Sequence, residues 1–363
     1  MAVPISTAAQ QEPAAHHKDA PKLGFGVHFT DHMVTMRWTS ARGWHPMRLE
    51  PYRPLELDPS ALGLHYGQIV FEGLKAYAQA DGTVALFRPG FNARRLNHSA
   101  ARLAIPPLPE ESFIEALQTL VAADRAWVPE GVGRSLYLRP YIMAVEPTIG
   151  VRPAREYLFV LIASPVDPFF STEVKPVTVW VADDYVRAAP GGTGDIKFPG
   201  NYAAAFLAQQ QAAEHGCDQV VWLDAVERRW VEEMGAMNLF FVVDDGRGKP
   251  AVLTPRLTGT LLPGAVRDSL IALATDAGYP VREEQVSIDR WQTGWEDGSI
   301  HEVFACGTAA VVTPVGALKR GEHQWRAPAG TGHPITLGLR RRLLDIQHGH
   351  IPDPHAWMTP VTG

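Results

Sequence analysis

A proline-rich segment near the middle of the chain limits its possible folds more than any other sequence feature. The segment SPVDPFFSTEVKP (164–176) places three prolines among small and polar residues, between two runs that are typical of strands. This composition is typical of a connector, because proline lacks a backbone donor and interrupts regular structure. A chain of 363 residues is also too long for one ordinary hydrophobic core. We therefore predict a mobile tail at 1–22, a small domain at 23–165, a linker at 166–176 and a larger domain at 177–363.

The spacing of apolar residues predicts that both domains mix helices and strands, so the expected fold class is α+β. Before the linker, the predicted strands are 32–38, 67–78, 84–88, 135–144 and 157–164, and the predicted helices are 91–104 and 110–127. After the linker, the strand-like runs VTVWVA, QVVWLD, LFFVV, AVLT and HEVFAC are interleaved with predicted helices at 201–215, 264–277 and 334–346. In the first of these three helices, Asn201 is a candidate N-cap and Gly216 a candidate stop.

Composition argues against several partners. The net charge of −6 is spread along the chain without a Lys/Arg cluster, so we expect no nucleic-acid partner. The longest apolar runs, such as YLFVLIA at 157–163, fall far short of the roughly 20 residues of a membrane span, so we expect a soluble protein. Only Cys217 and Cys306 occur, without CxxC spacing, which favours a cytoplasmic setting and argues against zinc. The irregularly spaced histidines near the C-terminus do not form a metal motif either, so no metal is expected.

Lys197 has the most informative chemical setting in the sequence. It is one of seven lysines and lies in GGTGDIKFPGNYA (191–203), whereas the other six have ordinary surroundings. The glycines allow the backbone to approach a ligand closely, and Asp195 is the only acidic residue nearby. A lysine amine that is kept partly neutral can attack a carbonyl such as that of pyridoxal phosphate. Taken alone, however, a lysine in a glycine-rich loop is more often simply solvated, so other motifs must decide.

Several blocks together resemble the signature blocks of branched-chain aminotransferases, which are pyridoxal-phosphate enzymes of fold type IV. These blocks are YGQIVFEGLKAY, FRPGFNARRLNHSAARL, SLYLRPYI, GGTGDIKFPGNYA, EEMGAMNLFFV and EVFACGTAAVV. They follow the family's order from about residue 25 onward, and LLDIQHGHIPDPHAWM resembles its closing segment. The resemblance covers nearly the whole chain. It implies the two-domain fold of D-amino-acid-aminotransferase-like enzymes, with the cofactor between a smaller N-terminal and a larger C-terminal domain.

The resemblance implies pyridoxal 5′-phosphate as the cofactor, together with the residues that hold it. Lys197 matches the lysine that bonds the cofactor and then moves the proton between the substrate Cα and the cofactor C4′. Glu233 matches the glutamate that faces the pyridine nitrogen, and Tyr202 the tyrosine that bonds the phenolic oxygen. Without this context, Glu233 would be a solvent-facing strand residue and Tyr202 a core residue. The residues that match the phosphate site are Arg95, Ala265, Val266 and Thr308.

The implied substrate site combines an apolar pocket with groups for carboxylates. Tyr137 and Arg139 alternate in SLYLRP and should point to one face of a strand. Arg139 is the candidate for the distal carboxylate of the second substrate, and the backbone of Ala309 and Ala310 matches the site of the α-carboxylate. The remaining matches are two aromatic pocket walls, Tyr66 and Phe71, and two residues of a loop that a neighbouring subunit supplies, Ile149 and Val151. The resemblance thereby implies a homodimer.

The implied function is reversible, ping-pong amino transfer between L-leucine, L-isoleucine or L-valine and 2-oxoglutarate. A D-amino-acid aminotransferase and an aminodeoxychorismate lyase are alternatives with the same fold, and a catalytically silent dimeric scaffold that binds the cofactor is an alternative of another class. Among the positions that depart from the family pattern, Ala236 replaces a threonine of some relatives, and Phe198 and Pro199 replace smaller residues. We expect these changes to adjust hydrogen bonding and loop geometry without abolishing activity.

Overall fold

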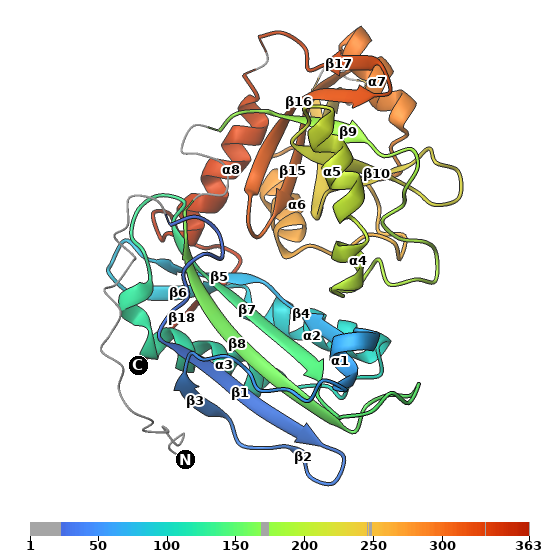
Figure 1. Cartoon of the computed structure of the whole chain (residues 1–363). Coiled ribbons are helices and arrows are strands. Elements are labelled where there is room, and N and C mark those ends of the chain that lie inside the picture. The colour runs from blue at the N-terminus through green and yellow to red at the C-terminus, as the bar shows by residue number, and fades with distance from the viewer. Residues whose placement is uncertain (1–22, 168–173, 245, 247–248, 331, 363) are drawn as a thin grey trace. The chain divides into compact units, whose positions relative to one another are not determined.

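The computed structural model describes residues 23–167, 174–244, 246, 249–330 and 332–362. The predicted tail at 1–22 and most of the predicted linker, residues 168–173, lie outside these ranges. The described residues form two compact units (Figure 1). Each unit contains a nine-stranded sheet with helices, which confirms the predicted α+β class.

The two units do not correspond to two continuous stretches of chain. The first unit contains the described residues up to 167, the tetrapeptide Ile196–Pro199 and the residues from Asp345 onward. The second unit contains the other described residues up to Leu344. The domain limits drawn from the sequence therefore stay a prediction. The tetrapeptide Ile196–Pro199, which contains Lys197, belongs to a different unit from the residues before and after it in the chain.

Every pairing between strands of the first sheet is antiparallel. The order is β18-β6-β5-β7-β8-β1-β2, with β3 paired to β1 and β4 paired to β7. The strands are β1 (His32–Thr39), β2 (Gly43–Trp44), β3 (Arg48–Pro51), β4 (Ile69–Phe71), β5 (Leu74–Ala78), β6 (Val84–Phe87), β7 (Ser135–Ala144), β8 (Glu156–Val166) and β18 (Met358–Pro360).

The predicted strand at 67–78 is wrong as a single element, because it is divided into β4 and β5. Both strands pair with β7 in the same register, from Ile69 opposite Met143 to Ala76 opposite Leu136. The interruption at Glu72 and Gly73 falls beside Pro140 of β7. Proline has no N–H to donate to a neighbouring strand, so the ladder is incomplete at this point.

Two long helices complete the core of the first unit (Figure 1). α2 (Pro89–Arg102) begins with a proline, which fits the first helical turn, and buries an apolar face with Ala93 and Leu96. α3 (Glu110–Ala123) buries Phe113 and Leu117 at helical spacing. The predicted helix at 110–127 extends too far, because its last residues form the 3-10 turn η2 (Arg125–Trp127). The remaining helix is α1 (Leu62–Tyr66).

The second sheet mixes parallel and antiparallel pairs. Its order is β11-β10-β9-β16-β15-β12-β13-β14, β17 pairs with β16, and a further pairing of β11 with β12 closes six of the strands into a ring. The strands are β9 (Val177–Val181), β10 (Gln219–Leu223), β11 (Val231–Met234), β12 (Met237–Asp244), β13 (Pro250–Thr254), β14 (Val281–Glu283), β15 (Ile300–Gly307), β16 (Val311–Arg320) and β17 (His323–Arg326).

The predicted helix at 201–215 is also wrong as a single element. The structure has α4 (Gly200–Ala203) and α5 (Phe206–Glu214) in its place. Asn201 lies inside α4 and not at the residue before a helix, and its side-chain amide donates to the Thr193 carbonyl at 2.7 Å while its side-chain carbonyl accepts from the Thr193 hydroxyl at 2.8 Å. Gly216 does follow the end of α5, with a left-handed φ of 67°.

The other helices are α6 (Ala265–Asp276), α7 (Ile288–Asp297) and α8 (Pro334–Gln347), and two of them match the predictions at 264–277 and 334–346. α7 was not predicted from the sequence, although Ser287 caps it by accepting the Arg290 N–H at 3.1 Å. Within the described ranges, no helix is both long enough and apolar enough to cross a membrane.

Candidate active site

Lys197 is held by its backbone within the first unit. Its N–H donates to the Ser99 hydroxyl oxygen on α2 at 3.0 Å, and its carbonyl accepts the Phe71 N–H of β4 at 3.1 Å. The side chain is half-buried, with Nζ 4.9 Å from the centroid of the Phe71 ring. The two backbone bonds fix the point from which the lysine side chain extends, between α2 and β4.

Arg95 forms a buried, two-point ion pair with Glu72. Its Nε and Nη2 donate to the two carboxylate oxygens at 2.7 and 2.8 Å. Asn92 Nδ2 and the Gly73 N–H also donate to this carboxylate, at 2.7 and 3.1 Å. Burial alone would raise the pKa of the Glu72 carboxyl, but Arg95, Lys197 and Asn92 outweigh it and hold the pKa below its usual value. Glu72 is therefore an anion at neutral pH.

Arg139 and Tyr137 meet on one face of β7, as their alternation predicts. Arg139 Nη2 donates to the Tyr137 hydroxyl at 2.8 Å, and the guanidinium carbon lies 4.9 Å from the centroid of the Phe71 ring. Arg139 Nε is buried, and no described residue bonds it. A guanidinium beside aromatic rings with an unbonded buried donor is suited to bind an anion.

Gly73 makes the position of Tyr137 possible. A Cβ atom at Gly73 would overlap the Tyr137 hydroxyl. Phe25 also contacts Tyr137, edge to face, with the ring centroids 4.9 Å apart. Glycine is thus required here for a close approach, and not for an unusual backbone angle.

The remaining first-unit residues of the implied site, Tyr66, Ile149 and Val151, belong with Leu64 to an exposed apolar patch. It consists of Leu64 and Tyr66 on α1, which are 55% and 50% exposed, and of Ile149 and Val151, which are 77% and 89% exposed. The Tyr66 hydroxyl donates to the Ile149 carbonyl at 3.1 Å, so the helix and the loop adjoin. Four large apolar side chains together on a surface commonly mark an interaction site.

In the second unit, Glu233 is a buried carboxylate in β11, not a solvent-facing strand residue. It is 1% exposed and forms an ion pair with Arg187, with Oε2 and Nε 3.0 Å apart. Its Oε1 accepts the Leu262 N–H at 2.7 Å, and Arg187 also donates to the Thr260 carbonyl at 2.6 Å. These bonds fix the carboxylate and tie it to the loop that leads into α6.

Glu232, the residue before Glu233, is also buried, and its carboxylate accepts a hydrogen bond from the Thr260 hydroxyl. Burial raises the pKa of the Glu232 carboxyl, and the Thr260 hydrogen bond and Arg187 offset this only in part. The two adjacent carboxyls of β11 therefore lie in different environments, with Glu232 biased toward its neutral form.

The predicted helix start lies close to Glu233. α6 begins at Ala265 after the N-cap Gly264, which has no side chain with which to cap the helix. Asn238 of β12 donates to the Leu262 carbonyl at 3.0 Å, and a Cβ atom at Gly264 would overlap the Asn238 side chain. Backbone N–H groups at the positive end of a helix dipole suit an anion such as phosphate.

The turn between β15 and β16 contains Thr308, Ala309 and Ala310. It belongs to the same neighbourhood, because Cys306 pairs with Asn238 across the sheet. The residue that follows the turn, Val311, has a left-handed φ of 61°, which is strained for a β-branched side chain. Such strain is often found at functional sites, where the surrounding structure maintains it.

Tyr202 lies on α4 and is half-buried.

Arg94, next to Arg95, is exposed, and its guanidinium lies 3.8 Å from the Glu110 carboxylate. Only the family resemblance, and no local sequence pattern, predicted that Arg95 and not Arg94 is the buried arginine.

Several residues of the site were missed from the sequence. Glu72, Ser99, Arg187 and Asn238 orient the candidate residues, and Phe25 packs against Tyr137. Only Glu72 carried a signal of its own, as a carboxylate inside the apolar run IVFEGLKAYA. Lys75, on the same run, was expected to have an ordinary setting but is 2% exposed in β5, which corrects that expectation.

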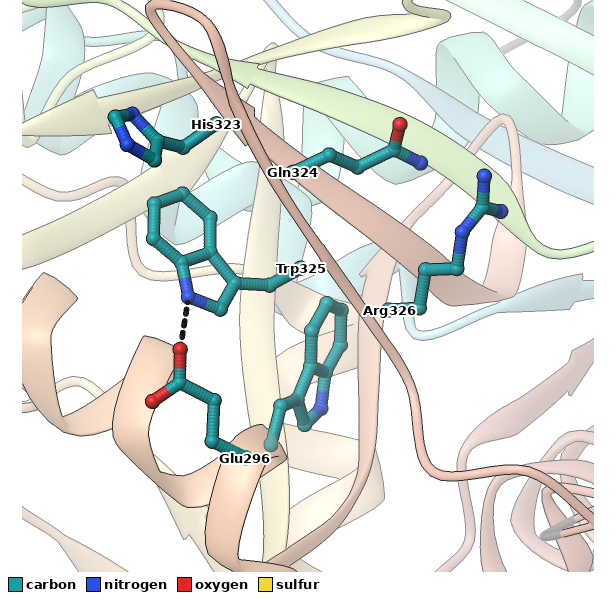
Figure 2. A pocket seen from close by; sticks show the side chains of 6 residues that line it. Glu296, His323, Gln324, Trp325 and Arg326 are labelled. Atoms are coloured by element: carbon teal, nitrogen blue, oxygen red, sulfur yellow. Dashed lines mark hydrogen bonds between the residues drawn. The ribbon is translucent and has the colours of Figure 1, made fainter.

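A cavity of about 490 Å³ on the second unit is separate from all of these residues. It is lined by Trp295, Glu296, His323, Gln324, Trp325 and Arg326. Figure 2 shows the Trp325 indole N–H donating to the Glu296 carboxylate at 2.8 Å. None of the residues that the resemblance assigns to the cofactor or substrate lines this cavity.

Comparison with curated proteins shows the family. The amino-transferase class IV family model matches residues 69–318. The branched-chain-amino-acid aminotransferase of Mycolicibacterium smegmatis is 57% identical over 336 residues, which are 92% of this chain and 91% of the relative. The branched-chain-amino-acid transaminase 1 of Bacillus subtilis is 46% identical over 97% of this chain and 99% of the relative.

Solved structures agree with the sequence comparison. A branched-chain amino acid aminotransferase of Escherichia coli matches with a TM-score of 0.74 at 26% identity, over 90% of this chain and 99% of the other. Another branched-chain amino acid aminotransferase, solved with pyridoxamine 5′-phosphate, matches with a TM-score of 0.72 at 28% identity, over 90% and 98%. The resemblance of the sequence blocks is thereby confirmed, and the chain belongs to the branched-chain-amino-acid aminotransferases of the class IV aminotransferase family.

Proposed function

We propose that the chain is a pyridoxal-phosphate-dependent transaminase that exchanges an amino group between L-leucine, L-isoleucine or L-valine and 2-oxoglutarate. The observation that carries this proposal is the half-buried Lys197, whose backbone is bonded to α2 and β4, in a chain 57% identical to a curated branched-chain enzyme.

The described residues fit pyridoxal 5′-phosphate. When bound, this group supplies a carbonyl carbon that a lysine amine can bond and a ring that accepts electrons. The start of α6 and the turn at Thr308 suit its phosphate, and the arginine-paired carboxylate of Glu233 suits a protonated ring nitrogen. The residues that would hold the group are Arg95, Lys197, Tyr202, Glu233, Ala265, Val266 and Thr308.

Lys197 would serve two purposes through one atom. Its Nζ would bond the cofactor at rest and, once an amino acid has taken that place, would move the proton between the amino acid's Cα and the cofactor's C4′. A base acts efficiently when it lies within hydrogen-bond reach of the proton and is held there. The backbone bonds of Lys197 to Ser99 and Phe71 would hold the start of its side chain, and the Phe71 ring lies beside Nζ.

Arg139 explains how one pocket could accept both a dicarboxylate and an aliphatic side chain. Its guanidinium lies against the Phe71 and Tyr137 rings, with the centroids 4.9 and 5.2 Å away, and its buried Nε has no partner among the described residues. The distal carboxylate of 2-oxoglutarate would pair with Arg139, whereas a branched chain would contact the ring surfaces. The backbone at Ala309 and Ala310 would bind the α-carboxylate.

The proposal includes a homodimer that works in the cytoplasm. The apolar patch of Leu64, Tyr66, Ile149 and Val151 supports the dimer, since a second subunit would remove these side chains from water. The low cysteine content supports a reducing compartment.

Absorbance spectroscopy tests the proposal directly. The purified protein with pyridoxal phosphate should show a visible band that L-leucine removes and 2-oxoglutarate restores. Lys197→Ala should lose the band, while Lys319→Ala, at a lysine bonded to the His215 carbonyl, should keep it. Absence of a band in the wild type would refute the lysine assignment. A response to D-alanine and not to leucine would favour the D-amino-acid alternative.

A further inference from the structure

Glu72 is the most deeply buried charged group in the described part of the first unit. Its side chain is 0% exposed, and that of its partner Arg95 is 6% exposed. A buried carboxylate is costly unless several donors satisfy it. Glu72 meets this condition with four hydrogen bonds, two from Arg95 and one each from Asn92 and the Gly73 N–H.

The donors to Glu72 come from the helix that also anchors the lysine. Asn92, Arg95 and Ser99 follow one another along one face of α2, at spacings of three and four residues. The Ser99 hydroxyl donates to the Arg95 carbonyl at 2.9 Å and accepts the Lys197 N–H at 3.0 Å. Glu72, Arg95 and Lys197 are thus connected through short bonds to one helix.

The charges on these groups also interact. Arg95 and Lys197 both stabilise the Glu72 anion, and such an interaction is reciprocal, so the anion stabilises positive charge on both of them. A glutamine at this position would carry no charge and would turn one oxygen into an N–H₂ donor. That donor would face the donors of Arg95 and Asn92.

We propose that Glu72 is a positioning residue of the active site, which fixes the Arg95 guanidinium for phosphate and stabilises positive charge at Lys197. This inference rests on the proposed function, because it concerns the same cofactor site. It assigns two separable effects to one carboxylate: its shape orients Arg95, and its negative charge stabilises the cationic groups around it.

Two substitutions separate these effects. Glu72→Gln removes the charge and keeps the length, so the dissociation constant for pyridoxal phosphate should rise about tenfold or more, and the pH midpoint of the visible band should fall by about one unit. Glu72→Asp keeps the charge and shortens the reach, so it should weaken cofactor binding while the midpoint stays near the wild-type value. Glu50→Gln is the control, since Glu50 is a 6% exposed carboxylate paired with Arg53 away from these residues, and both readouts should stay unchanged.

The outcomes distinguish this inference from the proposed function. If the wild type forms no band, the proposed function fails. If the wild type forms it and folded Glu72→Gln matches the wild type in both readouts, Glu72 is not a positioning residue. If Glu72→Gln does not fold, the result for Glu72→Asp decides: unchanged cofactor affinity, or failure to fold, overturns the proposal.

Discussion

Gly73 illustrates how a single residue can control the substrate site without contacting substrate. A methyl group at this position would displace the Tyr137 hydroxyl, which accepts the hydrogen bond from Arg139 at 2.8 Å. If Arg139 binds the distal carboxylate of 2-oxoglutarate, a displaced Tyr137 leaves its guanidinium poorly oriented. The residue therefore links backbone packing to the choice between a dicarboxylate and an aliphatic substrate.

We expect Gly73→Ala to raise the KM for 2-oxoglutarate about tenfold or more, because a hydrogen bond involving a charged group contributes about 1.5–3 kcal/mol. The KM for leucine should change less, since its side chain needs no cation. Steady-state kinetics with both substrates measures the difference. Gly338→Ala is the control: nothing lies within 4 Å of a Cβ there, and the helical position should gain stability from alanine. Equal changes in both KM values would contradict this role of Arg139.

At the scale of residues, the sequence pointed to the groups that we propose react but not to those that support them. Lys197 and Glu233 lie in blocks specific enough to be matched to a family. The supporting residues Arg187, Ser99 and Asn238 act on partners far away in the chain, such as Lys197 for Ser99 and Leu262 for Asn238. No local pattern encodes such pairs, so the structure was needed to find them.

At the scale of elements, the sequence predicted the long helices and strands and failed where tertiary contacts interrupt them. The strand at 67–78 is divided because its neighbour carries Pro140, and the helix at 201–215 is divided at residues 204–205, between α4 and α5. Apolar periodicity describes one element at a time, so it cannot predict an interruption that another element causes.

The segment after α8 contains a histidine that makes its packing sensitive to pH. His348 is 4% exposed; its Nε2 accepts the Gly133 N–H at 3.2 Å, and its Nδ1 lies 3.3 Å from the Ala78 carbonyl. Burial lowers the pKa of His348, with further lowering from His350 and Lys75, although the Ala78 carbonyl and Asp345 oppose it. The neutral ring satisfies both contacts, whereas a second ring proton would face the Gly133 N–H.

Because the folded-state pKa of His348 is depressed, its contribution to stability is present above the unfolded pKa of about 6.5 and is lost as the pH falls below it. We expect the free energy of unfolding to drop by about 1 kcal/mol from this group between pH 7.5 and 5.5. In His348→Gln, thermal unfolding should lose this part of the pH dependence. His45→Gln, at a partly exposed histidine bonded to Thr39, should retain it. An unchanged pH profile in His348→Gln would refute this assignment.

At the scale of the whole molecule, the exposed apolar patch predicts self-association. Replacing Ile149 and Val151 together by aspartate should convert the proposed dimer into a monomer, because two buried charges would oppose the interface. Sedimentation equilibrium measures the mass directly. Val132→Asp, at a residue that is 67% exposed elsewhere in the first unit, should leave the mass unchanged. A wild type that sediments as a monomer would remove the basis for a shared site.

The tetrapeptide Ile196–Pro199 has a consequence for how genes of this family could recombine. Lys197 is encoded downstream of the connector, yet it packs with residues such as Phe71 and Ser99 that are encoded upstream of it. A crossover at the connector would therefore combine Phe71 and Ser99 from one parent with Lys197 from the other. Exchange of halves between relatives should succeed only where the two parents agree at Phe71, Ser99 and the tetrapeptide, which makes these positions a compatibility barrier for chimeric enzymes.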